Sequence, residues 1–256
     1  MKLLIKKILS NEVITTLRNS LNIKPIQINK YYTNQKLSIS DAFLFRTDNN
    51  FSTSLRFSDL PKIFYKIENS SVEIIFCDYQ NNFLKKINLN NLNKVNELII
   101  DKKFLNNIET FGHFYLFHKI HATKNDTFHL SNRCYLGFSR HGTNPSFVHG
   151  NSFVKGRNYS NGNIISNFVK TSYIRNYEYS IQESFLEFDK VELFINNPTN
   201  KLITLEVNEC KYILKPDNDI RISLSKLEKI NIKSNCALLR PIVFTFKGSF
   251  YDVHHA

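Results

Sequence analysis

This sequence has little of several residues that mark whole protein classes. Its 256 residues include no Trp, seven Gly and six Pro, which excludes collagen-like chains and Gly/Pro-rich low-complexity chains. Its apolar runs stay far below the roughly 18 residues of a membrane-spanning helix, so we expect no membrane span. Lys6 and Lys7 interrupt the N-terminal apolar run. No secretory signal is therefore predicted, and we expect a cytoplasmic protein.

Cysteine is also scarce, and its spacing argues against the common zinc modules. The four Cys form neither a CxxC pair nor a Cys/His finger. They are Cys77, Cys134, Cys210 and Cys236. In a reducing compartment we expect four free thiols.

The apolar residues that are present suffice for a packed core. Hydrophobic residues make up 42% of the chain and aromatic residues 13%, which excludes a wholly disordered protein. Residues 42–45 read as a strand before a polar turn cluster at 46–50, and residues 51–57 alternate apolar and polar side chains. Such segments recur about every 8–12 residues, which favours antiparallel sandwiches over βαβ units.

Two segments resemble each other and indicate a duplication. Residues 72–89 and 191–207 each read as a strand, a turn and a second strand. The alternative is that any two hairpins of an Asn-rich chain look alike.

We therefore predict a mostly β protein. It would contain two antiparallel β-sandwich units of the jelly-roll or Ig-like kind, and a short N-terminal helix that ends at Pro25. The predicted organisation is a helical segment at 1–30, a first unit at 31–120, a basic connecting segment at 121–177 and a second unit at 178–256.

Acidic residues are nearly absent from the middle of the chain. The net charge is +12, and residues 110–177 contribute +7 of it, from eight Lys or Arg minus one acid, Asp126. Six of the seven Gly and six of the eight His fall between residues 112 and 162. A basic, glycine-punctuated segment inside a compact protein is typical of a functional loop system.

This middle segment combines groups that recognise an anionic or polyhydroxylated molecule. Arginine offers a planar fork of donors for carboxylate, phosphate or sulfate, aromatic rings offer flat apolar faces, and His and Asn add neutral hydrogen-bonding groups. The predicted ligand-binding residues are Arg133, Tyr135, Phe138, Arg140, His141, Asn144, His149, Asn151 and, from the last strand, Arg240. The alternative is a solvated basic loop whose aromatic residues pack into the core.

The histidines offer a metal site as a second interpretation. Neutral imidazoles bind Zn, Fe, Cu or Ni, and the predicted ligands are His113, His121 and His129. Residues 110–177 contain no Glu, so a carboxylate ligand would have to come from elsewhere, for example from Asp252. We predict no cofactor, with a divalent metal as the alternative.

Other chemistries find less support in the sequence. Residues 137–142 resemble a G-x-S-x-G elbow with one residue too many, and Cys134 lies near several His without a recognisable pattern. Basic and aromatic residues interleave as in single-strand binders, but no known nucleic-acid motif is present, so nucleic acid is not favoured as a partner.

The sequence favours a protein that binds, or acts on, an anionic or polyhydroxylated small molecule or a glycan. One alternative is a metal-dependent enzyme that uses the histidines at 113–149. The other is a structural or assembly protein of a phage or cell surface, with a basic strip that meets a partner. Whether the protein is an enzyme, and its oligomeric state, stay open.

Overall fold

A computed structural model describes most of the chain. The described residues are 37–120, 129–131, 134–149, 154–158, 164–169, 171–172, 174–181, 184–225 and 229–255, together with 13–14, 16–17 and 21. Strands make up 57% of them, so the mostly β character is confirmed. A short helix, α3 (Leu60–Tyr65), follows the third strand. Of the helix predicted within residues 1–30, positions 13–14 and 16–17 are helical, and most of the rest lies outside the described residues.

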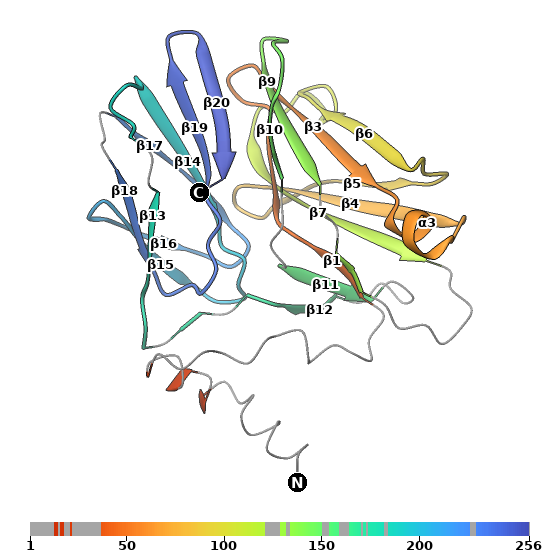
Figure 1. Cartoon of the computed structure of the whole chain (residues 1–256), viewed down its shortest axis with the longest axis horizontal. Helices are drawn as coiled ribbons and strands as arrows, with labels where there is room; N and C mark the ends of the chain where they lie inside the picture. The colour runs from red at the N-terminus through yellow and green to blue at the C-terminus, as the bar shows by residue number, and fades with distance from the viewer. Residues whose placement is uncertain are drawn as a thin grey trace.

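The strands form five four-stranded sheets, each named here after one of its central strands (Figure 1). The β7 sheet has the order β2 (Phe43–Arg46), β7 (Phe111–Ile120), β4 (Ser70–Asp78) and β5 (Phe83–Leu89). The β9 sheet has the order β10 (Ser146–His149), β9 (Tyr135–Arg140), β3 (Phe51–Ser58) and β6 (Val95–Ile100). The β14 sheet has the order β17 (Asp219–Leu224), β14 (Lys190–Asn196), β19 (Ile242–Lys247) and β20 (Phe250–His255).

In Figure 1, one of the remaining two sheets, with β18, lies at the left of the view, and the other, with β11, lies in the lower middle. The β18 sheet has the order β13 (Tyr177–Ile181), β18 (Ile230–Ser234), β15 (Ile203–Val207) and β16 (Cys210–Leu214). The β11 sheet has the order β12 (Ile164–Asn167), β11 (Lys155–Asn158), β1 (Leu37–Ser40) and β8 (His129–Ser131). Its β1–β8 pair is parallel, whereas the other four sheets are antiparallel throughout their described strands.

The four antiparallel sheets are arranged like the blades of a four-bladed β-propeller, so the prediction of two β-sandwich units is wrong. The β14 sheet shows why, because it is buried on both faces. Val191, Leu193 and Ile195 belong to one hydrophobic core. Phe194 and Phe244 belong to another, which includes residues of the β7 and β9 sheets. A strand that is apolar on both faces needs cover on both sides, so the sheets pack around it instead of forming isolated pairs.

The two hairpins predicted from the sequence have different outcomes. The hairpin at 72–89 is confirmed, because β4 pairs with β5. The prediction of a hairpin at 191–207 is wrong, because its two strands do not pair with each other. Instead β14 pairs with β17 and β19, whereas β15 pairs with β16 and β18. Between β14 and β15 the buried amide of Asn197 donates to the carbonyls of Lys201 and Leu214, and the chain passes into another sheet. The predicted duplication, which rested on the second hairpin, loses its basis.

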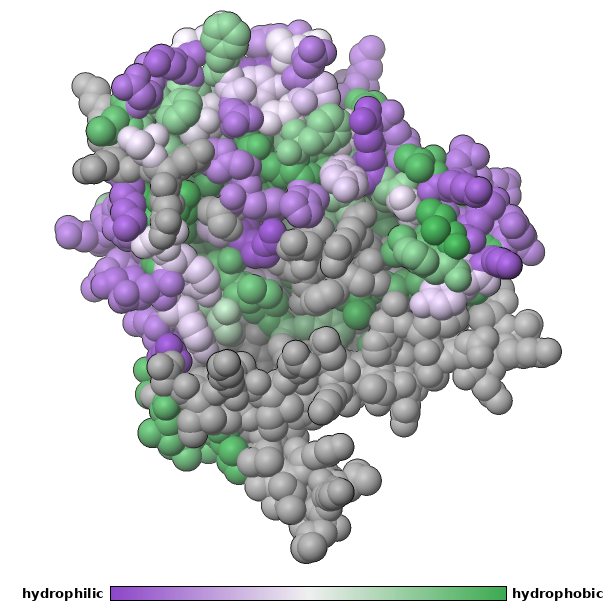
Figure 2. Space-filling model, in the orientation of Figure 1, coloured by the Kyte–Doolittle hydropathy of each residue, from purple (hydrophilic) through white to green (hydrophobic). Residues whose placement is uncertain are grey.

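The basic middle segment is built into the sheets. β9 pairs with β3 from Tyr135 opposite Arg56 to Arg140 opposite Phe51. On the face shown in Figure 2, hydrophilic and hydrophobic residues are interspersed over the coloured, described part of the surface. Within the described ranges, no helix is both long and apolar enough to cross a bilayer.

Candidate functional site

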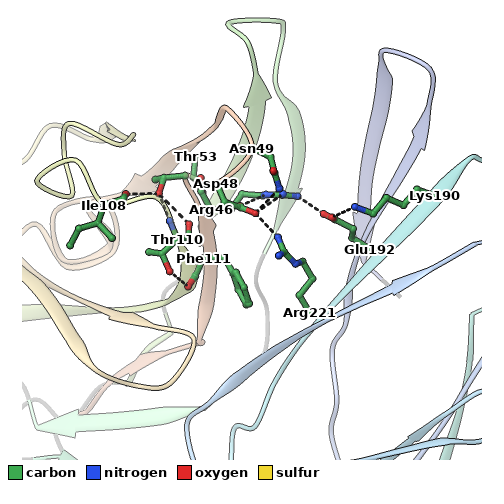
Figure 3. Close-up of polar contacts among 11 residues, drawn as sticks. Arg46, Asp48, Asn49, Thr53, Ile108, Thr110, Phe111, Lys190, Glu192 and Arg221 are labelled. Carbon is green, nitrogen blue, oxygen red and sulfur yellow. Dashed lines mark hydrogen bonds and ion pairs between the residues drawn. The ribbon is translucent and has the colours of Figure 1, made fainter.

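A buried arginine connects the β7 and β14 sheets. Arg46, at the end of β2, has a fully buried side chain. Its Nε donates to Asp48 Oδ1 at 2.9 Å and its Nη1 donates to Glu192 Oε2 on β14 at 2.9 Å. Lys190 Nζ donates to the other oxygen of Glu192 at 2.7 Å, and Arg221 of β17 reaches Asp48 (Figure 3). The network therefore satisfies the buried guanidinium with two carboxylates.

The same guanidinium lies among aromatic rings. Its carbon is 3.9 Å from the ring centroid of Phe51 and 4.8 Å from that of Phe244. Burial alone would raise the pKa of Glu192, but Lys190 and Arg46 outweigh burial and lower the pKa. Glu192 is thus held as the carboxylate, and Arg46 has a structural role because each of its three nitrogens already donates to a carboxylate.

A cleft of about 290 Å³ lies beside this network. We call it the Arg140 cleft; the Arg46–Glu192 pair borders it, and its other lining residues include Asn49, Phe51, Arg140, Lys190, Phe246 and Gly248. Arg46 comes from β2 of the β7 sheet, and the other lining residues come from the β9 and β14 sheets and from the turns next to them. The cleft therefore opens where these three sheets meet.

Among the charged residues that line this cleft, Arg140 and Asp189 form no ion pair with any described residue. The guanidinium carbon of Arg140 lies 5.8 Å from the ring centroids of both Phe51 and Phe246. Its Nε is buried and has no hydrogen-bond partner, and the guanidinium forms no ion pair within the described part of the chain. The nearby carboxylate of Asp189 accepts a hydrogen bond from Gly248 N at 2.7 Å. The arrangement presents a positioned cation with donors available to a ligand.

Local backbone geometry holds Arg140 in place. It is the last residue of β9, and the following turn uses positive φ angles at His141 (52°) and Gly142 (73°). Thr143 donates to the carbonyl of Arg140 from both its backbone N and its Oγ1. Phe51 lies directly opposite Arg140 across the β3–β9 pair. The strand register therefore brings cation and ring together.

The other residues predicted for this site are scattered. His141 and Asn144 are exposed in the turn beyond Arg140. Phe138 is fully buried, with its ring centroid 4.9 Å from that of Phe244, so it belongs to the core. Tyr135 is exposed at the opposite end of β9. The cleft therefore brings together few of the residues named from the sequence.

The remaining predicted residues lie elsewhere. His149 is opposite Tyr135 on β10, and its ring centroid is 5.9 Å from that of His255. Arg240 lines a separate, smaller cavity together with His255. Arg133 and Asn151 lie outside the described residues.

Of the predicted metal ligands, His113 is engaged with another partner. Its Nδ1 lies 2.7 Å from Asp219 Oδ2, and both side chains are buried. His121 and the side chain of His129 lie outside the described residues. Within the part that the structure describes, no group of three or more His, Cys, Asp or Glu is arranged to hold a metal ion.

Sequence reasoning missed most of the cleft. Phe51 and Phe246 look like ordinary strand residues, and Lys190 looks like a solvated strand end. A buried Arg46 was also not foreseen, because the polar residues after it predict a turn. An arginine that directly follows three apolar strand residues was the one available signal.

No protein-family model matches this chain, and no curated protein sequence matches it.

Proposed function

We propose that the Arg140 cleft binds a small anionic molecule that carries a carboxylate or phosphate group. The observation that supports this most concerns the guanidinium of Arg140, which lies over two Phe rings beside a cleft of about 290 Å³. Within the described part of the chain this guanidinium has no carboxylate partner. Guanidinium forks match carboxylate and phosphate oxygens in plane and spacing. An anion in the cleft would supply the missing partner.

The charges around the cleft favour an anion over a cation. Arg46, Arg140 and Lys190 line it, against Asp189 and Glu192. Glu192 is already used by Arg46 and Lys190, and Asp189 by a backbone N–H. The charge of Glu192 is thus compensated by two cations, Asp189 accepts a hydrogen bond from the backbone, and Arg140 has no ion-pair partner among the described residues.

The size and lining of the cleft narrow the ligand. Its volume lies near the lower end of the roughly 300–1,000 Å³ typical of small-molecule sites, which suits a single metabolite better than an oligosaccharide. Phe51 and Phe246 give the cleft apolar walls, so a ligand with an anionic group and an apolar or flat portion fits best. We propose binding as the function, because both carboxylates that line the cleft are engaged.

Titration calorimetry with paired ligands tests the proposal. The anions are glucose 6-phosphate, citrate and adenosine monophosphate, and the neutral counterparts are glucose and adenosine. We expect at least one anion to bind and its neutral counterpart to bind far more weakly. Arg140→Gln should weaken anion binding about tenfold to a hundredfold, the value of a hydrogen bond to a charged group.

Arg56→Gln is the matched control. Arg56 also lies over an aromatic ring, that of Phe147 at 4.8 Å, in the same sheet, but it pairs with Glu97 and lies outside the cleft. Its replacement should leave anion binding unchanged. Equal affinities of wild type and Arg140→Gln, or binding of none of the three anions, would refute the proposed function.

A further inference from the structure

A second cavity, of about 40 Å³, lies where β2, β9, β14, β19 and β20 approach one another. Four polar side chains line it: Asp41, Asn196, Arg240 and His255. His255 is the last residue of β20. This central cavity is separate from the Arg140 cleft, with which it shares no lining residue.

Several buried polar atoms around the central cavity lack partners. Among the described residues they are Nη1 of Arg240 and Oδ1 of Asn196. Both ring nitrogens of His255 also lack a hydrogen bond of ordinary geometry, although the carbonyls of His149 and Pro241 face the ring. A buried polar atom without a hydrogen bond destabilises the folded state, so such atoms are rare in folded proteins. Their convergence on one cavity indicates a bound group that satisfies them together.

The charge of Arg240 indicates that the bound group is an anion. Arg240 forms no ion pair with any described residue, and the carboxylate of Asp41, on the same cavity, already accepts a hydrogen bond from Ala42 N at 2.9 Å. Asp41 thus lies on the same cavity without forming an ion pair with Arg240. A partly buried guanidinium that lacks a direct ion pair is unfavourable, and an anion in contact with it relieves this more completely than water does.

We propose that the central cavity binds a small oxyanion and that His255 takes up a proton when the anion enters. Arg240 Nη1 and His255 donate hydrogen bonds to the anion, and the acceptor Asn196 Oδ1 receives the O–H of a protonated oxyanion such as hydrogen phosphate. At 10–15 Å³ for each water, the cavity has room for about three waters, which matches one such anion.

The charges and burial around His255 explain why it would gain a proton when an anion binds. Burial first, and then the charge of Arg240, lower the pKa of His255 to about 4, so the imidazole of the empty cavity is neutral at pH 7. His149 of β10 and the backbone carbonyls of His149 and Pro241 also face the ring, and Asp41 lies across the cavity. An anion against the ring favours imidazolium, so the anion-bound form has the higher pKa and binding tightens as pH falls.

Calorimetric titration of the full chain with inorganic phosphate tests this inference. We expect saturable binding that Arg240→Gln weakens at least about tenfold, with a smaller loss in Arg240→Lys, which keeps the charge but not the fork. Arg140→Gln should bind phosphate at the central cavity with unchanged affinity, which separates this site from the Arg140 cleft. Near-ultraviolet circular dichroism verifies that each variant is folded.

Proton uptake is measured at pH 6 by titration in two buffers of different ionisation enthalpy. Phosphate itself titrates near this range, so the protein's share is the difference between wild type and His255→Gln. Wild type should take up nearly one more proton per anion than His255→Gln. His254 is the adjacent histidine, on the opposite face of β20, and serves as the control. The variant His254→Gln should therefore take up protons as the wild type does.

Two results would overturn the inference. One is the absence of saturable phosphate binding, or binding that Arg240→Gln leaves unchanged, which would mean that the cavity holds water only. The other is equal proton uptake by wild type and His255→Gln, which would remove His255 from the site.

Discussion

His113 of β7 and Asp219 of β17 form a buried ion pair, with Nδ1 and Oδ2 2.7 Å apart across 106 residues of sequence. Asn196 Nδ2 donates to the other oxygen of Asp219 at 2.8 Å. Burial alone would lower the pKa of His113, but the carboxylate of Asp219 outweighs burial and raises the pKa from 6.5 to about 10. The pair therefore joins the β7 and β14 sheets as imidazolium and carboxylate at neutral pH.

The first prediction is that stability falls at alkaline pH. The folded-state pKa of His113 lies above its unfolded value, so its contribution is fully present below about pH 6.5 and is lost as pH rises through about 10. Urea denaturation at pH 6.5, 8 and 9.5 should give a decreasing free energy of unfolding. His113→Gln should flatten this decrease; an unchanged slope in the variant would contradict the assignment.

The second prediction concerns the carboxylate of this pair. Asp219→Asn leaves a buried imidazolium without its counter-charge, so it should destabilise the protein by about 3–5 kcal/mol. Glu178→Gln, at an exposed pair with Lys233, should cost less than about 1 kcal/mol. Combining Asp219→Asn with His113→Gln should recover part of the loss in urea denaturation. Strictly additive losses would show that the two residues do not interact.

The third prediction concerns Arg46, which the two carboxylates of Asp48 and Glu192 hold in the core. Arg46→Met removes the cation and leaves buried negative charge, so we expect a loss of about 3–5 kcal/mol in the free energy of unfolding. Arg46→Lys should also be destabilising, because an ammonium cannot bridge both carboxylates as the fork does. Arg56→Met, at an exposed pair, is the control and should change stability by less than about 1 kcal/mol.

The fourth prediction compares two glycines in strands. A Cβ at Gly112 would overlap the backbone oxygen of Cys77 and lie 2.8 Å from Cα of Asp78, and neither backbone atom can move cheaply. A Cβ at Gly137 would meet the ring of Phe147, a partly exposed side chain that can turn away. Thermal unfolding should therefore show a loss of about 1–3 kcal/mol for Gly112→Ala and a smaller one for Gly137→Ala. The reverse order would refute this packing argument.

Much of the strand pattern was predictable from the sequence, because alternation with a period of two is local. Residues 51–57 and the hairpin at 72–89 appear as expected. The hairpin at 191–207 failed because its turn residues are equally compatible with a crossover into another sheet. Only contacts made far along the chain, such as the amide of Asn197 with Leu214 O, distinguish the two.

The site residues show the same division. Arg140 was identifiable from its residue type in an acid-poor segment, but its partners Phe51 and Phe246 come from strands far away in the sequence. The sequence could not show whether Phe138 belongs to the core or stacks on a ligand, because a buried and an exposed Phe look the same in a sequence. Burial follows from which sheets cover a strand.

By itself, the sequence determined a β-rich chain with a large aromatic core and an acid-poor, arginine- and histidine-bearing middle, because composition and side-chain alternation are properties of short segments. The tertiary structure decided the propeller-like arrangement of sheets, the burial of Arg46, the pairing of His113 with Asp219 and the two cavities. Each of these depends on which strands lie next to each other. That choice is made by packing between residues that lie from about thirty to more than a hundred positions apart, which no local pattern encodes.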